Sequence, residues 1–143
     1  TVRNRIYSNI IRSGGTMATV IASSANVSPY AEIGYGTVIL QGACVNAASK
    51  IGDNVIINTL SNIDHDVIVS DNCHISTCAS LNGMVFVGHD TFIGSQAVVC
   101  QCVRVCDHVV VGAGSVVTKD LTQPGVYVGA PVRKIDQCGT CNI

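Results

Sequence analysis

Tryptophan is absent from the 143 residues, and aromatic side chains together make up only 4% of the chain. Charged residues are also scarce at 12%, against about 25% in an average soluble protein. Eight lysines and arginines against nine acidic residues leave no basic patch, which disfavours a nucleic-acid partner. No apolar run reaches the roughly 18 residues of a membrane span, and the start Thr-Val-Arg-Asn-Arg-Ile lacks the apolar core of a signal peptide. We therefore expect a cytoplasmic protein with no membrane partner.

The composition instead describes one domain built on aliphatic side chains. Hydrophobic residues make up 48% and the net charge is −1, the opposite of the signature of disorder. The eight cysteines include a Cys-Gly-Thr-Cys run at 138–141 and a close group at Cys100, Cys102 and Cys106. A single CxxC is weak evidence for zinc, so we expect reduced thiols that pack as small hydrophobic side chains, with a metal or redox role as the alternative.

A six-residue repeat runs through most of the chain. Every sixth position is a branched aliphatic residue, without exception or insertion: Ile21, Val27, Ile33, Ile39, Val45, Ile51, Ile57, Ile63, Val69, Ile75, Leu81, Val87, Ile93, Val99, Val105, Val111 and Val117. The fourth residue after each of the first sixteen is small or β-branched, from Ala25 to Ser115. A fixed period of this kind is the sequence signature of a solenoid.

The spacing predicts the geometry of that solenoid. Because six is a multiple of two, each aliphatic residue falls on the same face of a short strand and points inward. Three hexads close a triangular coil of 18 residues, and coils stack at the strand spacing of about 4.8 Å. Residue n then lies under residue n+18, and large aromatic side chains would not fit inside. The sequence therefore predicts an all-β fold, a parallel β-helix of hexapeptide type.

Two short segments flank the repeat. Residues 1–15 place Arg3, Ile6 and Ile10 at roughly helical spacing before a Gly-Gly stop, which predicts a helical lead-in. We assign residues 16–122 to the β-helix domain and residues 123–143, which contain Pro124 and Pro131, to a C-terminal tail.

The repeat contains few side chains that could do chemistry, and His65 is the best of them. It comes two residues after an inward aliphatic position, so it lies at a bend and points outward. Asp64 or Asp66 can accept the proton of its Nδ1, which leaves Nε2 free as a base. His74 follows half a coil later and faces another side of the prism, so the two histidines could meet only across a symmetric interface, as in a cyclic trimer. For His89 and His108 we expect solvated side chains without a role.

At these residues the chain resembles the sugar O- and N-acyltransferases of the sialic-acid and bacillosamine type. The shared runs are Asn58-Thr59, Asp64-His65-Asp66, His74-Ile75, Asn82-Gly83, Phe92-Ile93-Gly94-Ser95, residues 111–120 and Gly129-Ala130-Pro131. The resemblance covers roughly residues 16–134. It implies a left-handed β-helix, a homotrimer, and acetyl-CoA as the co-substrate that donates an acetyl group to an amine or hydroxyl of a sugar or nucleotide-sugar. Family members usually carry a small Rossmann-like domain ahead of a helix like that of residues 1–15.

The resemblance also implies roles for individual residues. His65 would be the general base, Asp66 the acid that raises its basicity, and Asn58 a polar group of the acceptor pocket. His74 would contact the thioester end of acetyl-CoA. Ser95 and Ala113, one coil apart, would line the pantetheine track, and no metal is required. Lys119, Arg133 and Lys134 are candidates for the CoA phosphates or, equally, solvated basic side chains.

Three other functions compete with this interpretation. An acetyltransferase with a non-sugar acceptor, such as an amino acid or antibiotic, would use the same chemistry. A β-helix trimer could serve assembly alone. A zinc carbonic anhydrase of β-helical type is disfavoured, because none of the four histidines lie five residues apart.

Overall fold

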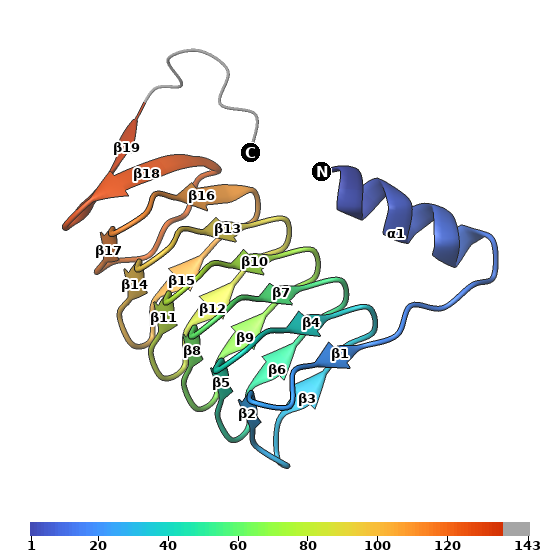
Figure 1. Ribbon diagram of the computed structural model, residues 1–143. Helices are drawn as coiled ribbons and strands as arrows, with labels where there is room; N and C mark the ends of the chain where they lie inside the picture. Colours follow the sequence, from blue (N-terminus) through green and yellow to red (C-terminus); the bar gives the residue numbers. More distant parts are fainter. Residues whose placement is uncertain (136–143) are drawn as a thin grey trace.

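The structure, a computed structural model, describes residues 1–135. One helix, α1 (Val2–Arg12), precedes a prism with three walls of short strands (Figure 1). The first sheet has the order β1 (Val20–Ile21), β4 (Val38–Ile39), β7 (Ile56–Ile57), β10 (His74–Ile75), β13 (Phe92–Ile93), β16 (Val109–Val111), β18 (Gly125–Gly129) and β19 (Val132–Ile135). The second has the order β17 (Val116–Val117), β14 (Val98–Val99), β11 (Ser80–Leu81), β8 (Asn62–Ile63), β5 (Cys44–Val45) and β2 (Asn26–Val27). The third has the order β15 (Arg104–Val105), β12 (Phe86–Val87), β9 (Ile68–Val69), β6 (Lys50–Ile51) and β3 (Glu32–Ile33).

The strand register confirms the predicted coil of 18 residues. His74 pairs with Ile56 on one side and with Phe92 on the other, and Ile75 pairs with Ile57 and Ile93. The same offset holds in every parallel pair from β1 to β17. The architecture is therefore the predicted all-β parallel solenoid with a single short helix, consistent with the left-handed β-helix that the resemblance implies.

The interior is the ladder of aliphatic residues that the repeat predicts. Ile39, Ile57 and Ile75 are fully buried in the first sheet, as are their counterparts in the other two walls. Hydroxyls also point inward, and each finds a backbone partner: Ser49 Oγ donates to Asp64 O at 2.6 Å, and Thr37 Oγ1 donates to Gly52 O at 2.8 Å. These bonds remove the cost of burying a polar group.

Three corners join the sheets, and each corner has four residues. We call them the first corner (58–61 and its stacked equivalents), the second corner (64–67) and the third corner (70–73). From residue 36 to 114 the third residue of every corner has a positive φ, for example 58° at Asp66, 54° at Asp90 and 56° at His108. Within each corner, the second and third residues therefore have the same backbone geometry as their counterparts in the other corners. Only the side chains at these two positions differ.

The C-terminal segment continues the fold further than the sequence indicates. Residues 125–135, which the sequence analysis assigns to a tail, form β18 and β19. Strand β18 adds in parallel to β16, and β19 folds back on it as an antiparallel partner. Tyr127 on β18 is only 8% exposed, and its hydroxyl donates to Gln123 O at 2.9 Å. The hairpin therefore closes the C-terminal end of the apolar interior.

Helix α1 docks beside the prism through polar contacts. Arg3 Nη2 donates to Gly36 O at 2.7 Å, and the Tyr7 hydroxyl donates to Asp53 Oδ2 at 3.0 Å. No residue of the helix is buried. The helix ends before Gly14 and Gly15, as the sequence predicts. Within residues 1–135, no helix has the length and apolar character that crossing a membrane requires.

The six described cysteines are free thiols. Cys73 points into the interior, where its Sγ donates to Gly88 O at 3.0 Å, and burial raises the pKa of this thiol to about 12. Cys138 and Cys141, which form the CxxC run, lie outside the described residues.

Candidate functional site

His65 and Asp66 occupy the second and third positions of the second corner. His65 Nδ1 lies 2.8 Å from Asp66 Oδ2, and the His65 backbone N–H donates to Asp64 Oδ1 at 2.8 Å. The sequence analysis allows either Asp64 or Asp66 as the hydrogen-bond partner of the imidazole, and in the structure that partner is Asp66. The positive φ of Asp66 turns its side chain back toward the preceding residue, which places the carboxylate beside Nδ1.

The other ring nitrogen of His65 stays free. Among residues 1–135, Nε2 has no hydrogen-bond partner. The ring lies over Gly83, one coil further on: an added Cβ at Gly83 would be 2.7 Å from Nε2 and 2.8 Å from Cε1. The absence of a side chain at position 83 therefore makes room for the imidazole.

The acidic neighbours make His65 more basic. The hydrogen bond to Asp66, followed by the charge of Asp64, raises the pKa of His65 above its ordinary value. An exposed imidazole whose Nδ1 proton is held by a carboxylate and whose Nε2 is free has the arrangement of a general base.

His74 and Asn58 form a second polar group, on another side of the prism. His74 lies on the outer face of the first sheet, where its ring meets Phe92 edge to face at a centroid distance of 5.2 Å. Asn58 Nδ2 lies 3.0 Å from His74 Nε2, while Asn58 Oδ1 accepts the Thr59 N–H at 2.7 Å. Because Nδ2 can only donate, Nε2 accepts, and the proton of the neutral ring is on Nδ1.

The environment of His74 favours the neutral ring. Burial, followed by the positive charge of Arg3, lowers the pKa of His74 below its ordinary value. His74 therefore presents Nδ1–H as a hydrogen-bond donor, whereas His65 presents Nε2 as an acceptor. The two histidines have opposite roles.

A single chain does not bring these groups together. His65 lies at the corner between the second and third sheets, whereas His74 lies on the outer face of the first sheet, after β9 of the third sheet and the third corner. The structure places Asn58 against His74 and gives it no contact with His65.

Ser95 and Ala113 are stacked on the first corner, beside the edge of the first sheet. The Gly114 N–H donates to Ser95 O at 2.8 Å, and Ser95 Oγ lies 2.9 Å from Ser76 Oγ. Gly114 has open space where a Cβ would be. The side chains at this corner are therefore small, so an extended molecule could lie close to its backbone.

The basic residues near the C-terminal end are dispersed. Lys119 is exposed on the second corner, and Arg133 and Lys134 are exposed on β19. Lys134 Nζ donates to Gln123 Oε1 at 3.3 Å. The structure does not gather the three cations into one cluster.

A second His–Asp pair was missed by the sequence analysis, which treats His89 and His108 as solvated. His89 Nδ1 lies 2.8 Å from Asp90 Oδ2, the same distance as in the His65–Asp66 pair, because both pairs take the second and third positions of a corner. Here, however, Nε2 is also occupied, 3.0 Å from Asp107 Oδ2. With both ring nitrogens facing carboxylates, His89 has no free lone pair and cannot act as the base.

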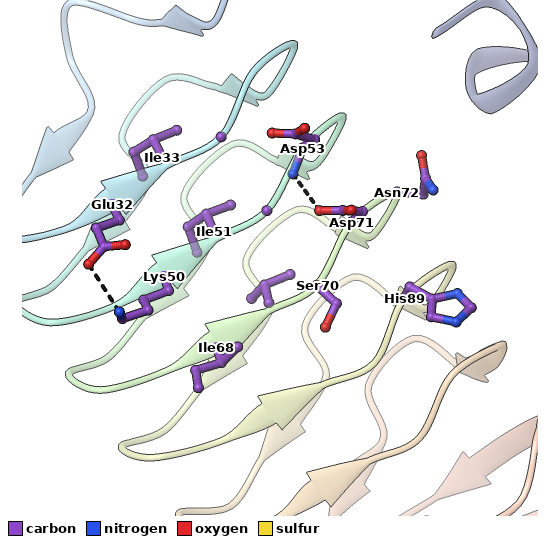
Figure 2. Close-up of a pocket in the computed structure, with 13 residues that line it drawn as sticks. Glu32, Ile33, Lys50, Ile51, Asp53, Ile68, Ser70, Asp71, Asn72 and His89 are labelled. Carbon is purple, nitrogen blue, oxygen red and sulfur yellow. Dashed lines mark hydrogen bonds and ion pairs between the residues drawn. The ribbon is translucent and has the colours of Figure 1, made fainter. Parts of the chain in front are cut away.

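One large groove lies away from both His65 and His74. About 630 Å³ in volume, it follows the outer face of the third sheet to the third corner, where Asp53, Asp71 and His89 succeed one another (Figure 2). Several polar groups that line the groove pair with one another. Glu32 and Lys50 form an ion pair at 3.1 Å, and the Asp53 N–H donates to Asp71 Oδ1 at 2.7 Å. Its lining includes neither member of the His65–Asp66 pair, so groove volume does not identify the base.

Comparison with known proteins agrees with the fold. Residues 84–119 match the family described as bacterial transferase hexapeptide (six repeats). No curated protein matches the sequence significantly.

Solved structures are much more similar. The acetyltransferase domain of PglB from Neisseria gonorrhoeae is 34% identical over 94% of this chain and 65% of that one, with a TM-score of 0.92. PerB from Caulobacter crescentus, solved with CoA and GDP-perosamine, gives the same identity and coverage and a TM-score of 0.92. WeeI from Acinetobacter baumannii is 26% identical over 94% of this chain and 66% of that one, with a TM-score of 0.87.

This chain thus spans slightly less than two thirds of the length of these structures. The PglB domain has also been solved with acetyl coenzyme A. The chain is therefore similar over 94% of its length to the acetyltransferase domain of PglB and to perosamine N-acetyltransferase, and its residues 84–119 match a family of hexapeptide-repeat transferases.

Proposed function

We propose that this protein is an acetyl-CoA-dependent acetyltransferase that acts on an amine or hydroxyl of a sugar or nucleotide-sugar. The observation that carries the proposal is the His65–Asp66 pair, at 2.8 Å, with a free Nε2 on the outer surface of a transferase-type β-helix. Similar structures contain CoA together with GDP-perosamine, which supports this substrate class.

His65 supplies the base in this reaction. Its Nε2 takes a proton from the acceptor nitrogen or oxygen as that atom forms its bond to the acetyl carbon. The carbon–sulfur bond of the thioester then breaks. The proton passes from the imidazolium to the sulfur, which leaves as the thiol of CoA. Asp66 holds the ring in the Nδ1–H tautomer and stabilises the imidazolium that forms, without itself being protonated.

Acetyl-CoA would supply the acetyl group in activated form, and the residues of the first sheet and first corner fit it. His74 offers a neutral Nδ1–H, which suits a carbonyl oxygen better than a second base would. Ser95, Ala113 and Gly114 leave the corner low enough for the pantetheine arm to lie close to backbone groups. Asn58 then belongs with His74 as the group that fixes its tautomer.

The separation of His65 from His74 supports a homotrimer. In a cyclic assembly, the second corner of one chain can face the first sheet of its neighbour, so that each site takes a base from one chain and a donor from the next. Sedimentation tests this directly: we expect a trimer at micromolar concentration, and a stable monomer would contradict the shared site. Because acetyl-CoA is a cytoplasmic metabolite, the proposal also places the protein in the cytoplasm.

The function itself is tested with purified protein and a panel of acceptors. We expect thiol release from acetyl-CoA that depends on an amino-sugar nucleotide. Release with amino acids or aminoglycosides instead would replace the sugar by a non-sugar acceptor. A protein that neither reacts nor shows a thermal shift with acetyl-CoA would be a structural trimer, contrary to the proposal.

A further inference from the structure

Two histidines and two aspartates form a square on the third corner. His89 and Asp90 are adjacent in one coil, and Asp107 and His108 occupy the same two corner positions in the next coil, 18 residues later. Each histidine is therefore stacked on an aspartate, and the two histidines lie on one diagonal. Backbone bonds fix this arrangement: the His89 N–H donates to Asp107 Oδ1 at 2.9 Å, and the His108 N–H donates to His89 O at 3.0 Å.

The side chains of this square converge. The rings of His89 and His108 meet edge to face at a centroid distance of 4.9 Å. One potential ligand atom from each of His89, Asp90 and His108 lies within 4.8 Å of the other two. Asp107 Oδ2 is 3.0 Å from His89 Nε2, which adds a second carboxylate. Asn4 of α1 donates to Asp90 Oδ1 at 2.6 Å and holds that carboxylate in place.

The local charge is independent of this geometry and favours a cation. Asp53 and Asp71 precede His89 at the same position of the third corner in successive coils (Figure 2), and Asp107 follows it one coil later. In the part of the chain that the structure describes, neither a lysine nor an arginine lies within 4.0 Å of any of these carboxylates or of Asp90. Within that distance, His89 is the basic side chain that the described residues place beside these carboxylates, so acidic groups outnumber basic ones in the row.

We infer that the His89–Asp90–His108 group, with Asp107 beside it, is a binding site for a divalent transition-metal ion such as Zn²⁺. Two imidazoles and carboxylate oxygens form a ligand set that zinc and its neighbours accept, whereas Mg²⁺ and Ca²⁺ prefer oxygen alone. Three protein ligands leave a coordination position open. Asp90 and His108 also line a cavity of about 460 Å³ that includes His74 and Phe92, so a small molecule could reach that position.

Metal binding at this site must displace a proton. With Nδ1 facing Asp90 and Nε2 facing Asp107, both nitrogens of His89 serve as donors. A ring nitrogen can bind a metal only after it loses its proton, so binding releases protons and weakens as the pH falls. Because the square joins two coils and contacts α1 through Asn4, the bound ion would also raise the unfolding temperature.

The His65–Asp66 pair provides a matched control. It has the same corner positions and the same 2.8 Å contact, but Gly83 and Met84 occupy the positions one coil further on where the square has Asp107 and His108. A metal site built from an isolated His–Asp pair would form there too. One built from the square would not.

The test uses chelator-treated protein in a Cys138→Ser/Cys141→Ser background, which removes the CxxC run as a competing site. Zn²⁺ affinity is measured by competition with a chromophoric chelator, together with proton release and unfolding temperature. We expect one equivalent of Zn²⁺, bound at least tenfold more weakly by His108→Ala and by Asp90→Asn, and unchanged in His65→Ala. The exposed positions of His108 and His65 make both variants compatible with folding.

Co²⁺ spectroscopy identifies the ligands without relying on the variants. We expect a spectrum of nitrogen and oxygen ligands, without the charge-transfer band of a thiolate. A thiolate band, or equal Zn²⁺ affinity in the parent protein and His108→Ala, would overturn the site. Neither readout depends on acetyl transfer, so the result is independent of the proposed function.

Discussion

A methyl group added at Gly83 should disable the base without removing it. The Cβ of Gly83→Ala would lie 2.7 Å from His65 Nε2, whereas ordinary contact begins at 3.4 Å. The ring must therefore retreat by about 3.4 − 2.7 = 0.7 Å, or rotate away from its position beside Asp66. A misplacement of about 1 Å in a reacting group costs roughly 10²-fold in rate. We expect kcat/KM to fall roughly 10- to 100-fold.

The fold should tolerate this change. Gly83 does not have a positive φ, and the atoms its Cβ would meet belong to the far end of an exposed side chain. Gln101→Ala, at the same corner position one coil further on, is the matched control and should retain activity. The unfolding temperatures of both variants should stay close to that of the parent.

A double variant decides whether the loss acts through His65. If Gly83→Ala only displaces the imidazole, it should cause little further loss in a His65→Ala background, because the two substitutions remove the same interaction. Full additivity of the two losses would refute the reasoning and indicate that Gly83 itself contacts the substrates.

Three further predictions follow from the same geometry. Asp66→Asn removes the main cause of the raised pKa of His65, so the acidic limb of kcat/KM should move to lower pH while the maximal rate falls; an unchanged pH profile would show that Asp66 does not act on the ring. Refolding a mixture of inactive His65→Ala and His74→Ala chains should restore some activity, because mixed trimers contain sites with one intact residue from each chain. Activity no higher than that of either parent would contradict the shared site. Gly94→Ala should lower the free energy of unfolding by about 1–3 kcal/mol in urea titrations, because its Cβ would meet the Ala113 backbone nitrogen at 2.6 Å, whereas Gly114→Ala meets nothing within 4 Å and has only its positive φ to overcome.

The sequence predicts the prism well because one period determines it. An aliphatic residue at every sixth position leaves a single way to bury all of them, and the 18-residue register follows. The period stops after Val117, and there the prediction stops too: nothing in the spacing of residues 125–135 indicates that Tyr127 caps the interior or that β19 folds back on β18.

The polar groups are harder to predict because their partners are one coil away. His89 and His108 look solvated when each is considered alone along the chain. Only the pairing of residue n with n+18 shows that Asp107 stacks on His89 and His108 on Asp90. The same holds for Asn58, whose contact with His74 spans 16 residues.

A glycine–aspartate spacing of 19 was also available in the sequence. An added Cβ at Gly34, Gly52 or Gly88 would collide with a carboxylate of the next coil, so these glycines make room for Asp53, Asp71 and Asp107. At the equivalent corner position, residue 70 is a serine instead of a glycine, and the residue 19 positions later is His89 instead of an aspartate. This exception is the sequence signal for the square on the third corner.

The most direct test of the account compares the two His–Asp pairs in one assay. Both pairs have the same 2.8 Å contact, but only His65 has a free Nε2. Thiol release from acetyl-CoA, measured with an amino-sugar nucleotide acceptor, should fall roughly 10²–10⁴-fold in His65→Ala, the usual contribution of a general base, with acetyl-CoA affinity little changed. The same substitution at His89 should leave kcat within a few-fold of the parent. Near-full activity in His65→Ala, or an equal loss in His89→Ala, would contradict the assignment of His65 as the base.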